Sequence, residues 1–156
     1  MEDVENCVER ADAVIHCLGI GGKGDGQPTS LISDAVKVTL SAMATHRVSR
    51  IVCMSNVGAG GSGTWFANRI IIPVFLPWLL PILRNKDRME GALRASSVEW
   101  VSVRLPNIID GPDKPIRVSD DGRGIGFSIT AASAARFLLA QATGTEFLRM
   151  TSSISN

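Results

Sequence analysis

The sequence predicts an α/β domain with a largely parallel sheet, and two observations lead to this prediction. Apolar or alternating runs recur at residues 12–18, 50–55 and 98–105, and the first, "DAVIHCL", is apolar enough to be covered on both faces. Segments with apolar residues at helical spacing lie between these runs. Strands that alternate with helices favour helices packed on a parallel sheet.

The first half of the chain supplies one complete crossover. Residues 2–11 indicate the end of an amphipathic helix, because its apolar side chains share one face: Val4, Cys7, Val8 and Ala11. After the strand at 12–18, a helix can begin at Pro28 or Thr29 and run to about residue 46, before the strand at 50–55. A crossover of this length makes a right-handed βαβ unit, so the two strands should be parallel.

The second half continues the alternation. Thr130 is a plausible N-cap for the last helix. The expected elements are a helix at 85–96, a strand at 98–105, two short extended pieces within 116–129, a helix at 131–142 and a closing strand at 146–151.

Length and composition bound the function. The chain, residues 1–156, has the size of one domain. Its formal net charge of +1 gives no electrostatic reason to expect nucleic acid or an anionic membrane as a partner. Three cysteines without a CxxC pair, in a sequence without a signal peptide, predict a reducing compartment, most simply the cytoplasm. Two well-separated histidines predict no metal cluster.

The run "IIIPVFLPWLLPIL" at residues 70–83 is the one segment that suggests a membrane. It has about 14 apolar residues, whereas a spanning helix needs about 20. Pro73, Pro77 and Pro81 would each disrupt helical hydrogen bonding. We therefore expect no spanning segment here but a buried or pocket-covering one, with an interfacial anchor as the alternative.

Two loops match the pattern G-x-G-x-x-G, at residues 19–24 and 58–63. In a dinucleotide fingerprint the strand turns tightly into a helix whose free N–H groups face the pyrophosphate. The first loop runs on through Gly26 to Pro28 before a helix can begin, and the second leads into the proline-rich run. We interpret both as loops in which glycine lets a ligand approach closely, and not as phosphate-binding fingerprints.

Four segments then appear in a recognisable order: "ADAVIHCLG", "RIVCMSNVG", "NKDRMEGALRASSVEWVSVRLPNIIDGP" and "SITAASAARFLLAQ". In this order they resemble the NAD(P)-binding atypical short-chain dehydrogenase/reductase superfamily, and most closely its NmrA-like and biliverdin reductase B (flavin reductase)-like members. The most specific stretch runs from Arg88 to Pro112. There, Ser97 and Leu105 replace a glycine and a proline of the family pattern.

The resemblance implies a partial Rossmann-like, doubly wound domain. The strand at 12–18 would be the family's fourth and the strand at 50–55 its fifth, so the first three strands and the phosphate-binding glycine loop would be missing. The chain would be about the C-terminal two thirds of a family domain. Its first strand would present an apolar, unpaired edge, which suggests a truncated gene model, an alternative isoform, or pairing with another chain, including self-association.

The resemblance also implies that NADP or NAD binds at the carboxyl ends of the strands. Ser55 would lie near the nicotinamide and donate a hydrogen bond to a developing oxyanion, or else be an ordinary strand-end serine. Lys86 would hold the nicotinamide ribose, or else be a solvated helix residue. The partner tyrosine of related dehydrogenases falls at Ile82, and the chain has no tyrosine, which excludes a tyrosine proton relay. Further cofactor contacts would come from Leu18, Gly19, Asn56, Pro106, Asn107 and Ile108.

The resulting hypothesis is an NAD(P)H-dependent reductase-like protein that transfers hydride to a flavin, a quinone or another small planar carbonyl substrate. The alternatives are a non-catalytic NmrA-like domain, which senses a dinucleotide and binds a protein, and an inactive fragment that cannot hold the cofactor without its phosphate loop.

Overall fold

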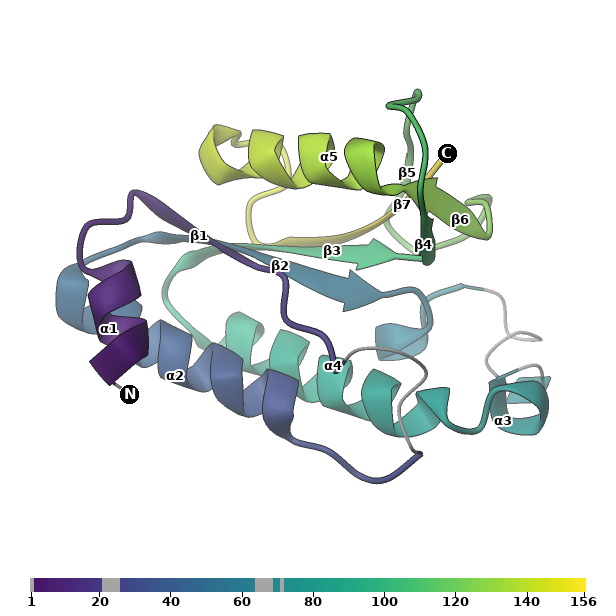
Figure 1. Ribbon diagram of the computed structural model, residues 1–156, viewed down its shortest axis with the longest axis horizontal. Helices are drawn as coiled ribbons and strands as arrows, with labels where there is room; N and C mark the ends of the chain where they lie inside the picture. The colour runs from purple at the N-terminus through teal and green to yellow at the C-terminus, as the bar shows by residue number, and fades with distance from the viewer. Residues whose placement is uncertain (1, 21–25, 64–68, 71) are drawn as a thin grey trace.

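The computed structural model describes residues 2–20, 26–63, 69–70 and 72–156, and it shows helices packed on both faces of a central sheet (Figure 1). The helices are α1 (Glu2–Val8), α2 (Leu31–His46), α3 (Ile72–Phe75), α4 (Leu79–Ala95) and α5 (Ala131–Thr143), and a 3-10 turn, η1, spans Ala59–Gly61. The strands are β1 (Ala13–His16), β2 (Arg50–Asn56), β3 (Glu99–Leu105), β4 (Asn107–Ile109), β5 (Arg117–Ser119), β6 (Ser128–Thr130) and β7 (Met150–Ser155).

The main sheet has the strand order β1-β2-β3-β7-β5 within the described part of the chain. The first four strands run parallel, and β5 pairs antiparallel with β7. β2 and β3 share the longest register, from Arg50 opposite Glu99 to Asn56 opposite Leu105, so their carboxyl ends are level. The predicted α/β class with a mainly parallel sheet is confirmed, as is the parallel unit made by β1, α2 and β2.

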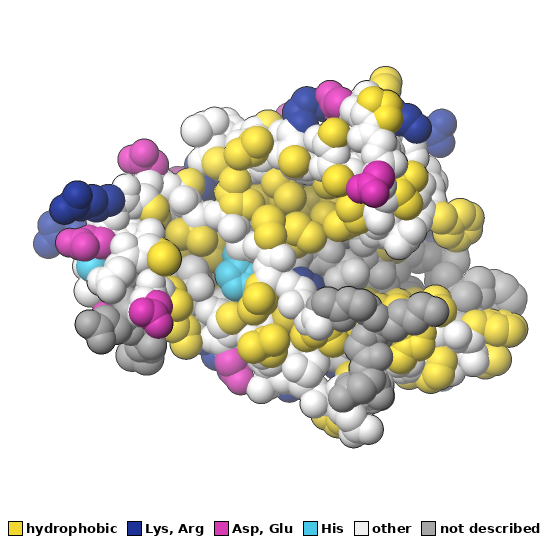
Figure 2. All heavy atoms as spheres, viewed as in Figure 1, with side chains coloured by type: hydrophobic (Ala, Val, Ile, Leu, Met, Phe, Trp, Pro, Cys, Tyr) yellow, Lys and Arg dark blue, Asp and Glu magenta, His cyan; other side chains and the backbone are white. Residues whose placement is uncertain are grey.

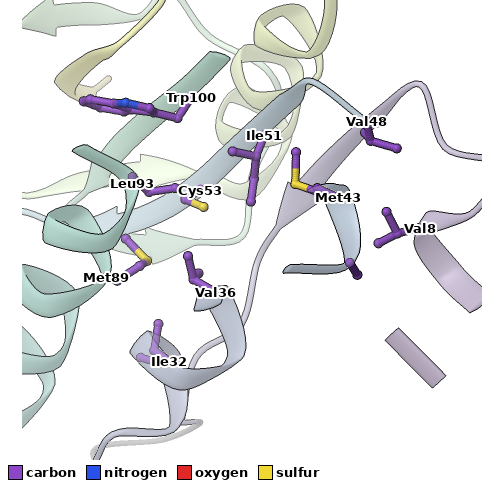
Figure 3. Close-up of a cluster of buried hydrophobic side chains, with 11 residues drawn as sticks. Val8, Ile32, Val36, Met43, Val48, Ile51, Cys53, Met89, Leu93 and Trp100 are labelled. Carbon is purple, nitrogen blue, oxygen red and sulfur yellow. The ribbon is translucent and has the colours of Figure 1, made fainter. Parts of the chain in front are cut away.

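Two hydrophobic layers enclose the sheet. On one face α1, α2 and α4 cover a hydrophobic cluster, shown in Figure 3, which includes Met43, Ile51, Met89, Leu93 and Trp100. On the other face α5 packs Phe137 and Leu138 against the sheet, and the N-cap predicted for this helix is confirmed because the Thr130 side chain accepts a hydrogen bond from the Ser133 N–H. The alternating strand faces therefore both meet helices, as the apolar strand pattern predicted.

Some predicted boundaries are wrong, and one reason is the proline-rich run. The helix expected from residue 85 begins at Leu79, because Pro81 falls in the first turn, where the backbone N–H has no intrahelical partner to lose. Pro73 lies inside the short helix α3 in the same way. No helix of the described residues is long and apolar enough to cross a membrane. The closing strand is also displaced, to Met150–Ser155.

β1 lies at the edge of the sheet. Its four residues pair with β2 on one side, from Ala13 opposite Arg50 to His16 opposite Cys53, and no other described strand pairs with it. All four side chains are half-buried. The strand is neutral, and it carries no proline or charged side chain of the kind that usually protects an edge. The unpaired edge expected from the sequence is confirmed.

Candidate functional site

The middle of α4 places polar side chains near the carboxyl ends of the parallel strands. Lys86 and Glu90 are four residues apart and therefore share one face of the helix, which is turned toward the sheet. Both are buried, with 3% of Lys86 and 0% of Glu90 exposed. Burying a charge costs several kcal/mol unless partners compensate, so the contacts of these two residues define the local structure.

Lys86 joins the ends of two neighbouring strands. Its Nζ donates to the carbonyl oxygen of Leu18, after β1, at 3.2 Å and to that of Met54, in β2, at 2.7 Å. Burial lowers the pKa of Lys86 from its ordinary 10.5 to about 8. The alternative that Lys86 is a solvated helix residue is wrong, because the ammonium group is enclosed and hydrogen-bonded to backbone.

The Glu90 carboxylate accepts hydrogen bonds from three side chains near the same edge of the sheet. Its Oε1 receives hydrogen bonds from Ser55 Oγ at 2.8 Å, Arg104 Nε at 3.0 Å and Ser102 Oγ at 3.3 Å, while its Oε2 receives one from Arg104 Nη2 at 2.6 Å. Burial by itself raises the pKa of Glu90, but the hydrogen bonds and charge of Arg104 outweigh it, so the pKa lies below the ordinary value. Glu90 is therefore ionised at neutral pH.

Ser55 lies at the expected end of β2, and its hydroxyl is engaged. The residue is 2% exposed, and its hydroxyl donates a hydrogen bond to the Glu90 carboxylate. A hydroxyl has one proton to donate, so Ser55 can donate to another group only by leaving Glu90. The structure thus places Ser55 and Lys86 on the same side of the sheet, joined to the protein through different partners.

The second glycine loop forms a closed turn around η1. Gly58, Gly60, Gly61 and Gly63 all have positive φ, which glycine adopts without strain. Three of these glycines donate backbone hydrogen bonds to protein acceptors. The Gly58 N–H donates to Ser62 Oγ, the Gly60 N–H to the carboxylate of Asp87, and the Gly63 N–H to the Asp121 carbonyl. A turn whose amides are used in this way, with a carboxylate beside Gly60, is not a phosphate cradle. The first loop extends into residues 21–25, outside the described residues.

The other predicted contact residues surround the same edge. Leu18 and Gly19 are exposed just beyond β1, and Asn56 is half-buried at the end of β2. Pro106 follows β3 directly, and the next two residues, Asn107 and Ile108, begin β4 and are exposed. Because parallel strands end at one edge, these residues come from three adjacent strand ends, as the sequence predicted.

An apolar groove opens beside this edge on the α5 face of the sheet. Figure 2 shows hydrophobic side chains gathered in a hollow on the visible face, in the region between α5 and β1. The groove has a volume of about 360 Å³, and its lining is almost entirely apolar, including Ile15, Cys17, Met54, Ile108, Leu138 and Leu139. It contrasts with the polar cluster on the α4 side, so the carboxyl edge has one polar and one apolar face.

Sequence reasoning missed three members of the polar cluster. Asp87, Glu90 and Ser102 were not singled out, and the pairing of Arg104 with Glu90 was not anticipated, although Arg104 is a charged residue in a core strand and Glu90 lies one helical turn after Lys86. A charge inside a core strand needs a partner, and this rule was the available signal. Among the described residues, no group of three or more His, Cys, Asp or Glu side chains could hold a metal ion.

Comparisons with known proteins agree with this arrangement. The chain is similar to a short-chain dehydrogenase/reductase (wide type) from Veillonella parvula DSM 2008, solved with NADP, at a TM-score of 0.76 and 14% identity, over 99% of this chain and 67% of that one. It is also similar to the anaerobillin reductase ChuY from Escherichia coli O157:H7, at a TM-score of 0.73 and 16% identity, over 99% of this chain and 69% of that one.

A third similar structure is the oxidoreductase ylbE from Lactococcus lactis, at a TM-score of 0.64 and 16% identity, over 99% of this chain and 66% of that one. The chain therefore spans about two thirds of the length of these structures, which share its fold. A family model described as NAD(P)H-binding matches residues 1–145. The chain thus belongs to this NAD(P)H-binding family.

Proposed function

We propose that the chain is an NAD(P)H-dependent oxidoreductase-like domain of the atypical short-chain dehydrogenase type, which reduces a flavin, a quinone or another planar carbonyl compound. The observation that supports this most is the buried Lys86, which joins the carboxyl ends of β1 and β2, next to an apolar groove. Flat, largely apolar rings suit such a groove, and ligands of open α/β sheets bind at the carboxyl ends of the strands. The NmrA-like and biliverdin reductase B-like resemblance favours the same substrate class.

The described residues can border the cofactor along three neighbouring strand ends. The exposed Leu18 and Gly19 would border its adenosine side, Pro106–Ile108 would border the carboxamide, and Asn56 lies on the strand between them. The pyrophosphate does not fit the glycine turn at residues 58–63, because its amides already have acceptors and Asp87 would repel the phosphates. No phosphate contact is therefore assigned to that turn.

The side chains of Lys86 and Ser55 would act on this site from the α4 side of the sheet. Bound NAD(P)H would supply the hydride. A lysine ammonium has three donors, and the Leu18 and Met54 carbonyls occupy two, so the third is suited to a ligand hydroxyl. Ser55 would polarise the substrate carbonyl only after transferring its hydrogen bond from Glu90. Its role as a catalytic residue is part of the proposal.

A second candidate function is dinucleotide sensing without turnover, and a specific observation favours it. The chain has no tyrosine, and the polar atoms of Ser55 and Lys86 both have protein partners. An NmrA-like domain that binds a dinucleotide and a protein needs no proton donor. An inactive fragment that lacks the pyrophosphate contacts is the third candidate, and the binding experiment below separates it from the others.

We also propose that a second copy of the chain can pair with β1, in the reducing environment of a cytoplasm. Two-fold antiparallel pairing of β1 edges can place Val14 opposite Ile15 and Ala13 opposite His16, with no like charges facing each other. The apolar groove lies next to this edge, so association would cover both features.

The test is a titration of the purified chain with NADPH, followed by nicotinamide fluorescence, and then turnover with FMN or a quinone as acceptor. Saturable binding with turnover that falls in Ser55→Ala, but not in the exposed control Ser97→Ala, supports the reductase. Saturable binding without turnover supports the sensor. The absence of binding at any NADPH concentration contradicts both and leaves the inactive fragment.

A further inference from the structure

We propose that Glu90 is a positioning residue, which fixes the Ser55 hydroxyl and, through Arg104, the glycine turn at residues 58–63. The proposal extends the proposed function because both features border the carboxyl edge. Its main evidence is geometric and does not require that the cofactor binds. Glu90 is fully buried, and each of its oxygens faces a different part of this edge.

The link between Glu90 and the glycine turn passes through the guanidinium group of Arg104. Arg104 is held by two hydrogen bonds to Glu90, one to each carboxylate oxygen, which fixes the plane of the group. The backbone of Gly60 lies close to the Nη2 end of this group. A Cβ built on Gly60 would overlap Arg104 Nη2 and would lie 3.2 Å from Cζ and 3.5 Å from Glu90 Oε2. While Arg104 keeps this position, the turn can therefore take its present path only if residue 60 has no side chain.

The helix holds the turn at a second point. Asp87, one residue after Lys86, accepts a hydrogen bond from the Gly60 N–H. The middle of α4 thus contacts the β1 and β2 ends through Lys86, the turn through Asp87, and the ends of β2 and β3 through Glu90. These contacts make α4 the element that sets the relative positions of the strand ends, and Glu90 makes the largest number of them.

Stability alone does not explain this ion pair. Replacing a buried ion pair by apolar residues of similar volume is often neutral or stabilising, whereas removing one partner is strongly destabilising. A carboxylate is distinguished from an apolar residue by its ability to accept from Ser55 and Arg104 together, in fixed directions. The function of Glu90 should therefore be visible in the order of the turn and not only in the melting temperature.

The experiment compares amide hydrogen exchange in the wild-type chain with three variants. The double variant Glu90→Met with Arg104→Met removes the charges while filling the space. Arg104→Lys keeps the ion pair but removes the guanidinium group beside Gly60. Arg94→Gln is the matched control, because Arg94 is the exposed partner of Glu90, at 3.5 Å with half of its side chain in solvent.

We expect exchange of the turn amides of Gly58, Gly60 and Gly63 to accelerate by about tenfold or more relative to the β2 and β3 core amides in the first two variants, and to stay unchanged in the control. The proposal would be overturned if the turn amides keep wild-type protection in Arg104→Lys. This single variant decides the question even if the double variant does not fold. If wild type binds NADPH, weaker NADPH binding in the double variant at an unchanged melting temperature supports it. If wild type does not bind, the proposed function fails, while the exchange experiment still decides the role of Glu90.

Discussion

Substituting Gly60 with alanine tests the packing of the glycine turn against Arg104, and Gly61→Ala is its control. Both glycines have positive φ, at 59° and 72°. Both substitutions therefore carry the cost of a left-handed alanine, about 1–2 kcal/mol. Only Gly60→Ala adds a steric conflict, because an added Cβ meets the Arg104 guanidinium at position 60 and no atom within 4 Å at position 61.

The additional cost follows from the surroundings of Arg104. The side chain is buried and bonded to Glu90, so it cannot swing away without leaving the buried carboxylate with the half-exposed Arg94 as its remaining charged partner. Overpacking of this kind costs about 1–3 kcal/mol. For a domain of this size, 1 kcal/mol corresponds to about 2–4 °C in Tm. We therefore expect Gly60→Ala to melt roughly 2–12 °C below Gly61→Ala.

The assay is thermal unfolding of the two variants by circular dichroism, with urea unfolding as a check on the free energy. Equal destabilisation of the two variants would refute the reasoning, because it would mean that the turn is free to move away from Arg104. The variant Gly60→Ala with Arg104→Ala provides a further arm. In this double variant the steric cost should disappear, although the loss of the ion pair remains.

Three further predictions concern other parts of the molecule. The pKa of Lys86 in the folded chain, about 8, lies below its ordinary 10.5, so wild type should gain stability relative to Lys86→Met as pH rises from 8 to 10.5. Urea unfolding at each pH measures this, and a difference in unfolding free energy that stays constant with pH would contradict the burial of the charge. Thr130→Ala should lower the free energy of unfolding by about 1–2 kcal/mol, since it removes the cap of α5, whereas the exposed Thr45→Ala should change it little, and urea denaturation distinguishes the two. Leu139→Lys in the apolar groove should reduce self-association, whereas Val74→Lys, at a similarly exposed position on α3, should not. Light scattering after size-exclusion chromatography measures the mass, and the same mass for both variants and wild type would contradict the second-copy proposal.

The sequence was sufficient to predict the α/β layers and the parallel unit made by β1, α2 and β2. The strand at 50–55 and the helix before it have strong patterns, and the N-cap at Thr130 follows from its side chain. The first residues of the elements were harder to predict. α4 begins at Leu79 because proline is tolerated in a first helical turn, a positional effect that a count of prolines does not capture.

The candidate site could be located from the sequence, but the contacts inside it could not. The strand-end positions of Ser55 and Pro106 follow from the strand boundaries, since parallel strands end at one edge. Whether Lys86 faces solvent or the sheet depends on the rotation of α4 about its axis, which only the packing of Met89 and Leu93 fixes. The buried partners of Glu90 lie 12 to 35 residues away in the chain, so no local pattern reveals them.

The most direct test of the central claim, that the carboxyl edge organised by α4 is the cofactor site, is a hydrogen-exchange footprint of the purified chain with and without saturating NADPH. We expect slower exchange in peptides that contain Leu18, Asn56 and Asn107, and no change at the amino ends of the same strands, near Ala13 and Arg50. Protection confined to other regions, or no protection at all, would contradict the account.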